Sequence, residues 1–161
     1  MSQTDFVVDR EKLEVRISRM FDAPRDLVFK ACTDPAMIPQ WWGPRRFTTT
    51  VDKMDVKVGG VWRFIQHDTE GNEFAFNGVY KEIVPPERVV QTFEFEPMAG
   101  HILTETVTFE AMTEGTTKMS VVVAYGTIQD LDGMVASGMK DGLFESHDRL
   151  AQLVENVPSF E

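Results

Sequence analysis

The chain has 161 residues, 42% of them hydrophobic, and a formal net charge of −10. We expect a single domain with a substantial core over residues 1–161, in which residues 1–10 form a loose N-terminal arm. An acidic chain without a Lys/Arg run is a poor partner for nucleic-acid phosphates or anionic membranes, so no nucleic acid and no membrane are expected as partners.

The single cysteine, Cys32, excludes an intrachain disulfide and agrees with a reducing compartment. It could be a nucleophile, but its apolar helical neighbours favour a small buried hydrophobe. The first residues lack the basic and apolar regions of a signal peptide, and the longest apolar run, 121–125, is too short to cross a bilayer. We therefore expect a cytoplasmic protein.

The first elements are a strand and two short helices. Residues 13–18 alternate between apolar and polar side chains, which predicts a strand with one wet face. Pro24 suits the first turn of a short helix, and Asp34-Pro35 predicts the start of a second one. Gly43-Pro44 ends that second helix.

From residue 47 to residue 127 the sequence predicts strands separated by turns. The apolar parity changes between 47–51 and 54–58, which indicates a bulge near Asp52-Lys53. Gly59-Gly60 is typical of a hairpin turn. Further strands are expected at 61–67, 73–84, 88–96, 102–111 and 117–127. This regular spacing predicts an antiparallel meander.

The last predicted element is a long amphipathic helix from Asp130 to Val157. Its apolar residues recur at helical spacing over about seven turns. Asp130 or Asp132 can cap its start, and Pro158 stops it. A single helix of this kind has one obvious place to bury its apolar stripe, the face of the sheet.

Small residues interrupt the middle of this stripe. Gly138, Gly142 and Ser146 recur at every fourth position beside larger apolar residues. They indicate either close contact between helix and sheet or a space left unfilled.

Short motifs follow one another in a specific order along most of the chain. They are RMFDAP at 19–24, VFKA at 28–31, TDP at 33–35, WWGP at 41–44, GGVWRF at 59–64, NGVYKEI at 77–83, PPERVV at 85–90, GTT at 115–117, Gly142 and DRLA at 148–151. Together they resemble the SRPBCC superfamily (START and Bet v 1-like domains). Within it, the sequence is most similar to the AHSA-type family, the homologues of the activator of heat-shock-protein-90 ATPase.

The resemblance implies an α+β helix-grip fold. In that fold a curved antiparallel sheet of about six to seven strands wraps round a long C-terminal helix, with two short helices after the first strand and a cavity between sheet and helix. The family supplies no fixed catalytic residues. The eukaryotic co-chaperone carries a separate N-terminal domain for which this chain leaves no room, so chaperone activation is an alternative reading rather than the first.

Strand parity predicts which side chains face the helix. The predicted ligand pocket consists of Trp42, Trp62, Phe64, Phe76, Tyr80, Phe93, Phe95, Glu105, Tyr125, Met139, Gly142, Leu143 and His147. The aromatic residues suit an apolar pocket with a few polar anchors, and they would equally suit an ordinary core. Glu105 and His147 could form its polar end, with Arg63 or His67 near it. Alternatively, Glu105 lies in water and His147 at the edge of the core.

Other kinds of site have little support in the sequence. The three histidines have no ligand-spaced partner, and one cysteine makes no zinc motif. Nucleophile-elbow, P-loop and dinucleotide fingerprints do not occur. We expect no metal, no cofactor and no catalytic residue.

The resulting prediction is a protein that binds a small hydrophobic or amphipathic molecule between sheet and helix. One alternative is a chaperone-associated interaction module. Another is an enzyme that uses Glu105 and His147 as an acid/base pair. The oligomeric state stays open, with a homodimer possible.

Overall fold

The computed structural model describes residues 4–113 and 115–155, which form an α+β fold with one antiparallel sheet. The sheet has the order β1-β2-β8-β7-β6-β5-β4-β3. Its strands are β1 (Asp5–Asp9), β2 (Glu14–Phe21), β3 (Thr48–Met54), β4 (Val61–His67), β5 (Glu73–Val84), β6 (Arg88–Phe95), β7 (Leu103–Ala111) and β8 (Thr117–Ala124).

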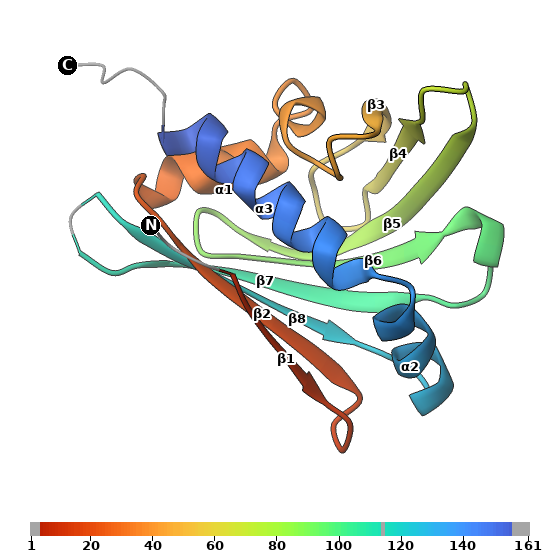
Figure 1. Ribbon diagram of the computed structural model, residues 1–161. Coiled ribbons are helices and arrows are strands. Elements are labelled where there is room, and N and C mark those ends of the chain that lie inside the picture. Colours follow the sequence, from red (N-terminus) through yellow and green to blue (C-terminus); the bar gives the residue numbers. More distant parts are fainter. Residues whose placement is uncertain (1–3, 114, 156–161) are drawn as a thin grey trace.

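The helices lie together on one face of this sheet, as Figure 1 shows. That face is called the inner face below. The helices are α1 (Arg25–Thr33), α2 (Ile128–Ala136) and α3 (Met139–Glu155), with short 3₁₀ turns η1 (Ile38–Gln40) and η2 (Glu96–Met98). In Figure 1, α3 runs across the curved sheet, with α1 near its C-terminal end and α2 near its N-terminal end.

The sheet has eight strands, so the expected six to seven were too few. The additional strand is β1, in the segment expected to be a loose arm, and it pairs with β2 from Asp5↔Ser18 to Asp9↔Glu14. A tight turn in which Leu13 has a φ of 57° lets the chain fold back on itself. The backbone of β2 thus gives this short segment hydrogen-bonding partners that it lacks alone.

The predicted single helix from Asp130 to Val157 is wrong, because α2 and α3 are separate. α2 begins two residues earlier than expected, and the side chain of Thr127 caps it by accepting a hydrogen bond from Asp130 N at 3.1 Å. Gly138, with a φ of 87°, then turns the chain between the helices. A left-handed glycine is a common helix terminator, and the apolar stripe alone did not reveal it. The expected end at Val157 and the stop at Pro158 lie outside the described residues.

The second short helix, expected from Asp34-Pro35 to Trp41, is only the 3₁₀ turn η1. The expected bulge is confirmed, since the register of β3 against β4 shifts between Val51 and Lys53. β4 and β5 have the bounds predicted for them.

The inner face carries the residues that strand parity predicted. Trp62 and Phe64 of β4 are 1% and 5% exposed. Trp62 packs against Gly78 of β5, where a Cβ atom would come within 2.4 Å of the indole Nε1 and 1.9 Å of the Thr92 carbonyl oxygen. Only glycine permits this close approach of an indole to the strand.

α3 is attached mainly at its sides. Its backbone comes closest to β2, η1, α1 and α2, none of which lies in the middle of the sheet. Ser146 accepts a hydrogen bond from Gly43 N at 3.1 Å and donates one to Trp41 O at 3.3 Å. Arg149 donates to Gly43 O at 2.8 Å and to Gln40 O at 3.2 Å. These contacts position the helix over the sheet.

Two glycines test the break between α2 and α3. Gly138→Ala should lower the free energy of unfolding by about 1–2 kcal/mol, because an L-residue is strained at that φ. Gly133→Ala, inside α2 where nothing lies within 4 Å of a new Cβ, should instead raise it by about 0.5–1 kcal/mol. Urea denaturation of both variants measures these changes. Stabilisation by Gly138→Ala would argue for one continuous helix.

Candidate functional site

Six aromatic rings form a connected group on the inner face, called the aromatic cluster below. Its members are Trp42, Trp62, Phe64, Phe76, Phe93 and Phe95, all of them in the predicted pocket. Trp42 meets Phe64 and Phe76 edge-on, with ring centroids 5.1 and 5.2 Å apart. Phe76 stacks on Phe95 at 5.0 Å. The cluster joins the chain after η1 to strands β4, β5 and β6.

The aromatic cluster is not sealed by the helices. Phe76, Phe93 and Phe95 are only half-buried, although β5 and β6 are interior strands of the sheet. Val107 on β7 is half-buried as well. By contrast, the inner face under α1 is tightly packed, where Phe29 meets Phe109 at 5.3 Å and Phe109 is 1% exposed. Among the described residues no enclosed cavity is found between α3 and the sheet.

Glu105 points to the inner face, as its parity predicted. It lies opposite Gln91 of β6, whose side-chain amide donates a hydrogen bond to Glu105 Oε1 at 2.9 Å. Burial raises the pKa of the Glu105 carboxyl, and the bond from Gln91 offsets part of that rise. Glu105 nevertheless keeps some exposed surface. Burial therefore makes the neutral carboxyl more favourable than it is in a solvated glutamate, and part of the side chain remains accessible.

Tyr125 lies diagonally across the β7–β8 pair from this carboxyl, and Met139 contacts Tyr125. Tyr125 is 6% exposed, and its hydroxyl donates to Met139 Sδ at 3.6 Å. Burial raises the pKa of Tyr125, and the charge that Glu105 would carry raises it further. Tyr125 thus stays a hydrogen-bond donor at neutral pH, at present directed to a thioether, which is a weak acceptor.

Tyr80 of β5 and Cys32 of α1 lie on the other side of Gln91 from Glu105. Tyr80 pairs with Gln91 across β5 and β6 and is 2% exposed. Burial and the neighbouring Cys32 raise the pKa of its hydroxyl. Cys32 is half-buried, and burial raises the pKa of its thiol to about 12. A thiol that stays protonated is a poor nucleophile, which agrees with its expected role as a small hydrophobe.

His147 has different neighbours from Glu105. Burial and the positive charge of Arg19 lower its pKa to about 4, although Asp148 acts in the opposite direction. Its Nδ1 atom is fully buried without a hydrogen-bond partner among the described residues. Met139, which contacts Tyr125 next to Glu105, lies eight residues or about 12 Å from His147 along α3. The structure therefore does not bring Glu105 and His147 together as an acid/base pair.

The remaining predicted residues are at the edge of the aromatic cluster. Leu143 is half-buried on α3. Gly142 faces the chain after η1, where a Cβ atom would lie 3.5 Å from Pro44 Cγ. That is an ordinary van der Waals distance, so Gly142 does not mark close packing of helix against sheet. Arg63 and His67 point away from this region, since Arg63 pairs with Glu96 and Asp52, and His67 with Glu73.

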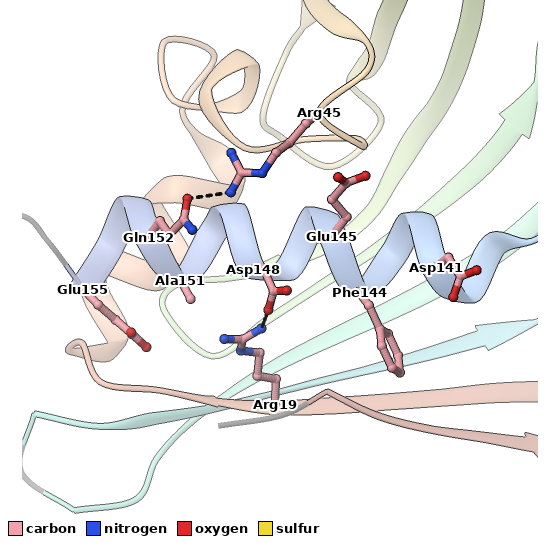
Figure 2. Close-up of a pocket in the computed structure, with 9 residues that line it drawn as sticks. All are labelled: Arg19, Arg45, Asp141, Phe144, Glu145, Asp148, Ala151, Gln152 and Glu155. Carbon is pink, nitrogen blue, oxygen red and sulfur yellow. Dashed lines mark hydrogen bonds and ion pairs between the residues drawn. The ribbon is translucent and has the colours of Figure 1, made fainter. Parts of the chain in front are cut away.

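The pocket that the structure does show lies along the exposed side of α3 (Figure 2). Its volume is about 790 Å³, and it is open to solvent. Arg45 borders one side of the helix and Arg19 the other, and they contact Gln152 and Asp148 respectively. The lining residues are Arg19, Arg45, Asp141, Phe144, Glu145, Asp148, Ala151, Gln152 and Glu155. None of the residues of the predicted ligand pocket lines it.

Sequence reasoning missed Gln91 and Arg19. Gln91 shares the parity of Phe93 and Phe95, and Arg19 shares that of Val15 and Ile17, so strand alternation was the available signal. Both were passed over because polar residues are usually assigned to the wet face of a strand.

Metal-ligand sets and membrane-spanning helices are absent from the described part of the chain. Within residues 4–113 and 115–155, no three His, Cys, Asp or Glu side chains gather as a metal-ligand set. Over the same residues, no helix has the length and apolar character that a membrane span requires.

Comparison with known proteins gives a family and a fold. A family model described as Activator of Hsp90 ATPase homolog 1-like protein matches residues 22–155. No curated protein matches the chain. Solved proteins from Arthrobacter aurescens and Rhodobacter sphaeroides are each 22% identical to this chain and superimpose on it with a TM-score of 0.87. Each match covers 96% of this chain, together with 93% of the Arthrobacter protein and 100% of the Rhodobacter protein.

A protein from Chromobacterium violaceum is 28% identical, with a TM-score of 0.78 over 89% of this chain and 99% of that one. These likenesses agree with the expected helix-grip fold.

The pKa of His147 makes stability depend on pH. Because it falls from 6.5 to about 4 on folding, the unfolded chain binds this proton first as the pH drops. Stability is therefore complete above pH 6.5 and is lost between 6.5 and about 4, by about 3 kcal/mol. We expect His147→Leu to remove this loss and the control His67→Gln to keep it, in urea titrations across that range. An equal loss in both variants would assign the effect to other groups.

The titration of Glu105 should make stability depend on pH in the opposite direction. The unfolded chain releases its proton near pH 4.5 while the folded protein retains it, so stability falls as the pH rises above 4.5. Glu105→Gln should remove this fall, so its stability relative to wild type should grow as the pH rises above about 4.5. The control is Glu110→Gln, at an exposed position of the same strand. A pH-independent difference for Glu105→Gln would contradict the raised pKa.

Proposed function

Because the chain belongs to the family of Activator of Hsp90 ATPase homolog 1-like proteins, whose model matches residues 22–155, we propose that it binds a small apolar or amphipathic ligand between α3 and the inner face of the sheet. The ligand would lie against the aromatic cluster, with Glu105 and Tyr125 at its polar end. Met139, Leu143 and Gly142 of α3 would border it from above.

One observation carries this proposal. Glu105 and Cys32 are each desolvated strongly enough for burial to raise their pKa, yet each keeps accessible surface. Both side chains therefore lie at the border of the densely packed region, where a ligand could still contact them. The two residues come from α1 and β7, on opposite sides of Tyr80 and Gln91.

The half-buried rings support the same location. A filled core would bury Phe76, Phe93 and Val107 on interior strands almost completely. Their partial exposure leaves apolar surface that a ligand could cover, at roughly 25 cal/mol for each Å². Since α3 is attached at its sides, small rotations of Met139 and Leu143 would adjust the space to a ligand.

The family description names a chaperone-ATPase activator, which was our alternative reading. The accessible aromatic surface of the inner face suits a small ligand and does not require a protein partner. We therefore propose ligand binding alone and take no catalytic role for Glu105 or His147.

Filling the space should block the ligand. Val107→Phe adds volume at a half-buried inner position of β7, whereas Thr108→Phe adds it on the exposed face one residue away. We expect saturable binding of the uncharged dye Nile red to the wild type, about tenfold weaker binding by Val107→Phe, and unchanged binding by Thr108→Phe. Fluorescence titration measures the affinities, and thermal melts measure stability.

Other results are expected if the inner face is a filled core. If the region is an ordinary core, the wild type should not bind the dye, and Val107→Phe should overpack the core at a cost of about 1–3 kcal/mol. That pair of results would overturn the proposed function.

A further inference from the structure

Arg19 of β2 is a buried cation in the wall of the pocket that runs along α3 (Figure 2). The residue is 6% exposed, and its guanidinium carbon lies 5.4 Å from the centroid of the Phe21 ring. Figure 2 shows it on the side of α3 from which Phe144, Asp148 and Ala151 project. This side of the pocket is called the Arg19 groove below. A buried guanidinium is costly unless acceptors around it satisfy its N–H groups.

The described residues leave most of this guanidinium unpaired. Nη1 donates a hydrogen bond to Asp148 Oδ1, whereas Nε and Nη2 have no hydrogen-bond partner among these residues. Nε is fully buried, but Nη2 is not one of the fully buried unpaired atoms and therefore reaches accessible surface. Nη1 and Nη2 form the end of the guanidinium, whose geometry matches the two oxygens of a carboxylate. Arg19 thus offers the groove a two-donor site, and Asp148 uses one of the two donors.

Asp148 is a replaceable partner for this site. Its side chain is 62% exposed, compared with 5% for Arg19, so Asp148 can turn into solvent while Arg19 stays buried. An ion pair with one partner in water gains little, because water competes for the carboxylate. The charge of Arg19 also acts inside the protein, where it adds to the effect of burial in lowering the pKa of His147 to about 4. The chain's own groups therefore compensate the buried guanidinium only in part.

The other carboxylates of the pocket leave room for an anion at Arg19. Glu155 accepts a hydrogen bond at 2.9 Å from a backbone N–H just after β2. Glu145 projects from the opposite side of α3 (Figure 2). Asp141 precedes Asp148 by seven residues, about 10 Å along the helix, which exceeds the Debye length of about 8 Å at physiological ionic strength. Asp148 is therefore the main competitor of an anion for Arg19.

We propose that the Arg19 groove binds an amphipathic carboxylate. The two carboxylate oxygens accept hydrogen bonds from Nη1 and Nη2 of Arg19 in place of Asp148, and the apolar body of the ligand lies along Phe144 and Ala151. Phe144 is half-buried and meets Phe6 of β1 edge-on at 6.3 Å, so the groove has an aromatic surface beside its cation. None of the residues of the inner face that the proposed function uses lines this groove, and the two inferences are independent.

The test compares three probes. They are 2-naphthoate, 2-naphthamide, which has the same ring system without the charge, and acetate, which has the charge without the rings. We expect saturable binding of naphthoate to the wild-type protein and at least tenfold weaker binding of the other two, because the ion pair and the rings both contribute. Isothermal titration calorimetry measures the affinities. In ¹⁵N NMR spectra, the Arg19 Nε–Hε resonance should shift with naphthoate and not with naphthamide.

Removal of the competing carboxylate gives the sharper result. Asp148→Ala frees the end of the guanidinium, so this variant should bind naphthoate about tenfold more tightly than the wild type, and naphthoate should raise its melting temperature more. Glu145→Ala is the matched control, because it removes the same charge from the opposite side of the same helix, and it should change the affinity less than twofold. Arg19→Gln should abolish naphthoate binding, and circular dichroism melts verify that each variant folds.

Several results would overturn the proposal. They are equal gains in Asp148→Ala and Glu145→Ala, which would assign the effect to the overall charge of α3, equal affinity for naphthoate and naphthamide, and no naphthoate binding by either the wild type or Asp148→Ala. The inner face is tested separately. Val107→Phe should leave naphthoate affinity unchanged, and Asp148→Ala should leave Nile red binding unchanged. Loss of naphthoate binding in Val107→Phe would place the anion on the inner face and overturn the assignment to Arg19.

Discussion

The attachment of α3 at its two sides is the constraint on which the inner face depends. Ser146 and Arg149 bind backbone groups of residues 40–43 on one side, and Asp148 pairs with Arg19 of β2 on the other. Backbone groups paired in this way fix the height and direction of a helix more strictly than apolar contacts, which are non-directional. The helix is therefore positioned largely by its polar sides.

This arrangement divides the inner face into two parts. Near the C-terminal end of α3, the contact of α1 with β7 and the full burial of Leu150 and Val154 make a conventional core. Towards its N-terminal end, the aromatic cluster keeps accessible surface and α3 presents Met139 and Leu143. The packed part stabilises the fold, whereas the residues of the open part could differ without loss of the fold.

Burial shifts the pKa values of two titratable groups, one on β7 and one on α3. It favours the neutral form of both, so it raises the pKa of the Glu105 carboxyl and lowers that of the His147 imidazole. The two groups affect stability in opposite directions as the pH changes, and about 12 Å of helix separates His147 from the residues around Glu105. The chain's acidic surplus lies elsewhere, including the exposed side of α3.

The sequence by itself determined the features that depend on local periodicity. It predicted the bounds of β4 and β5, the bulge after Val51, and the inward direction of Trp62, Phe93 and Glu105, because alternation and turn glycines act within a few residues. Only the tertiary structure decided the rest. β1 forms because β2 offers it partners, and Gly138 ends α2 although the apolar stripe continues. The distance between α3 and the sheet is set by contacts such as Ser146 with Gly43, 103 residues apart, and periodicity reports which face is apolar but not how closely two faces approach.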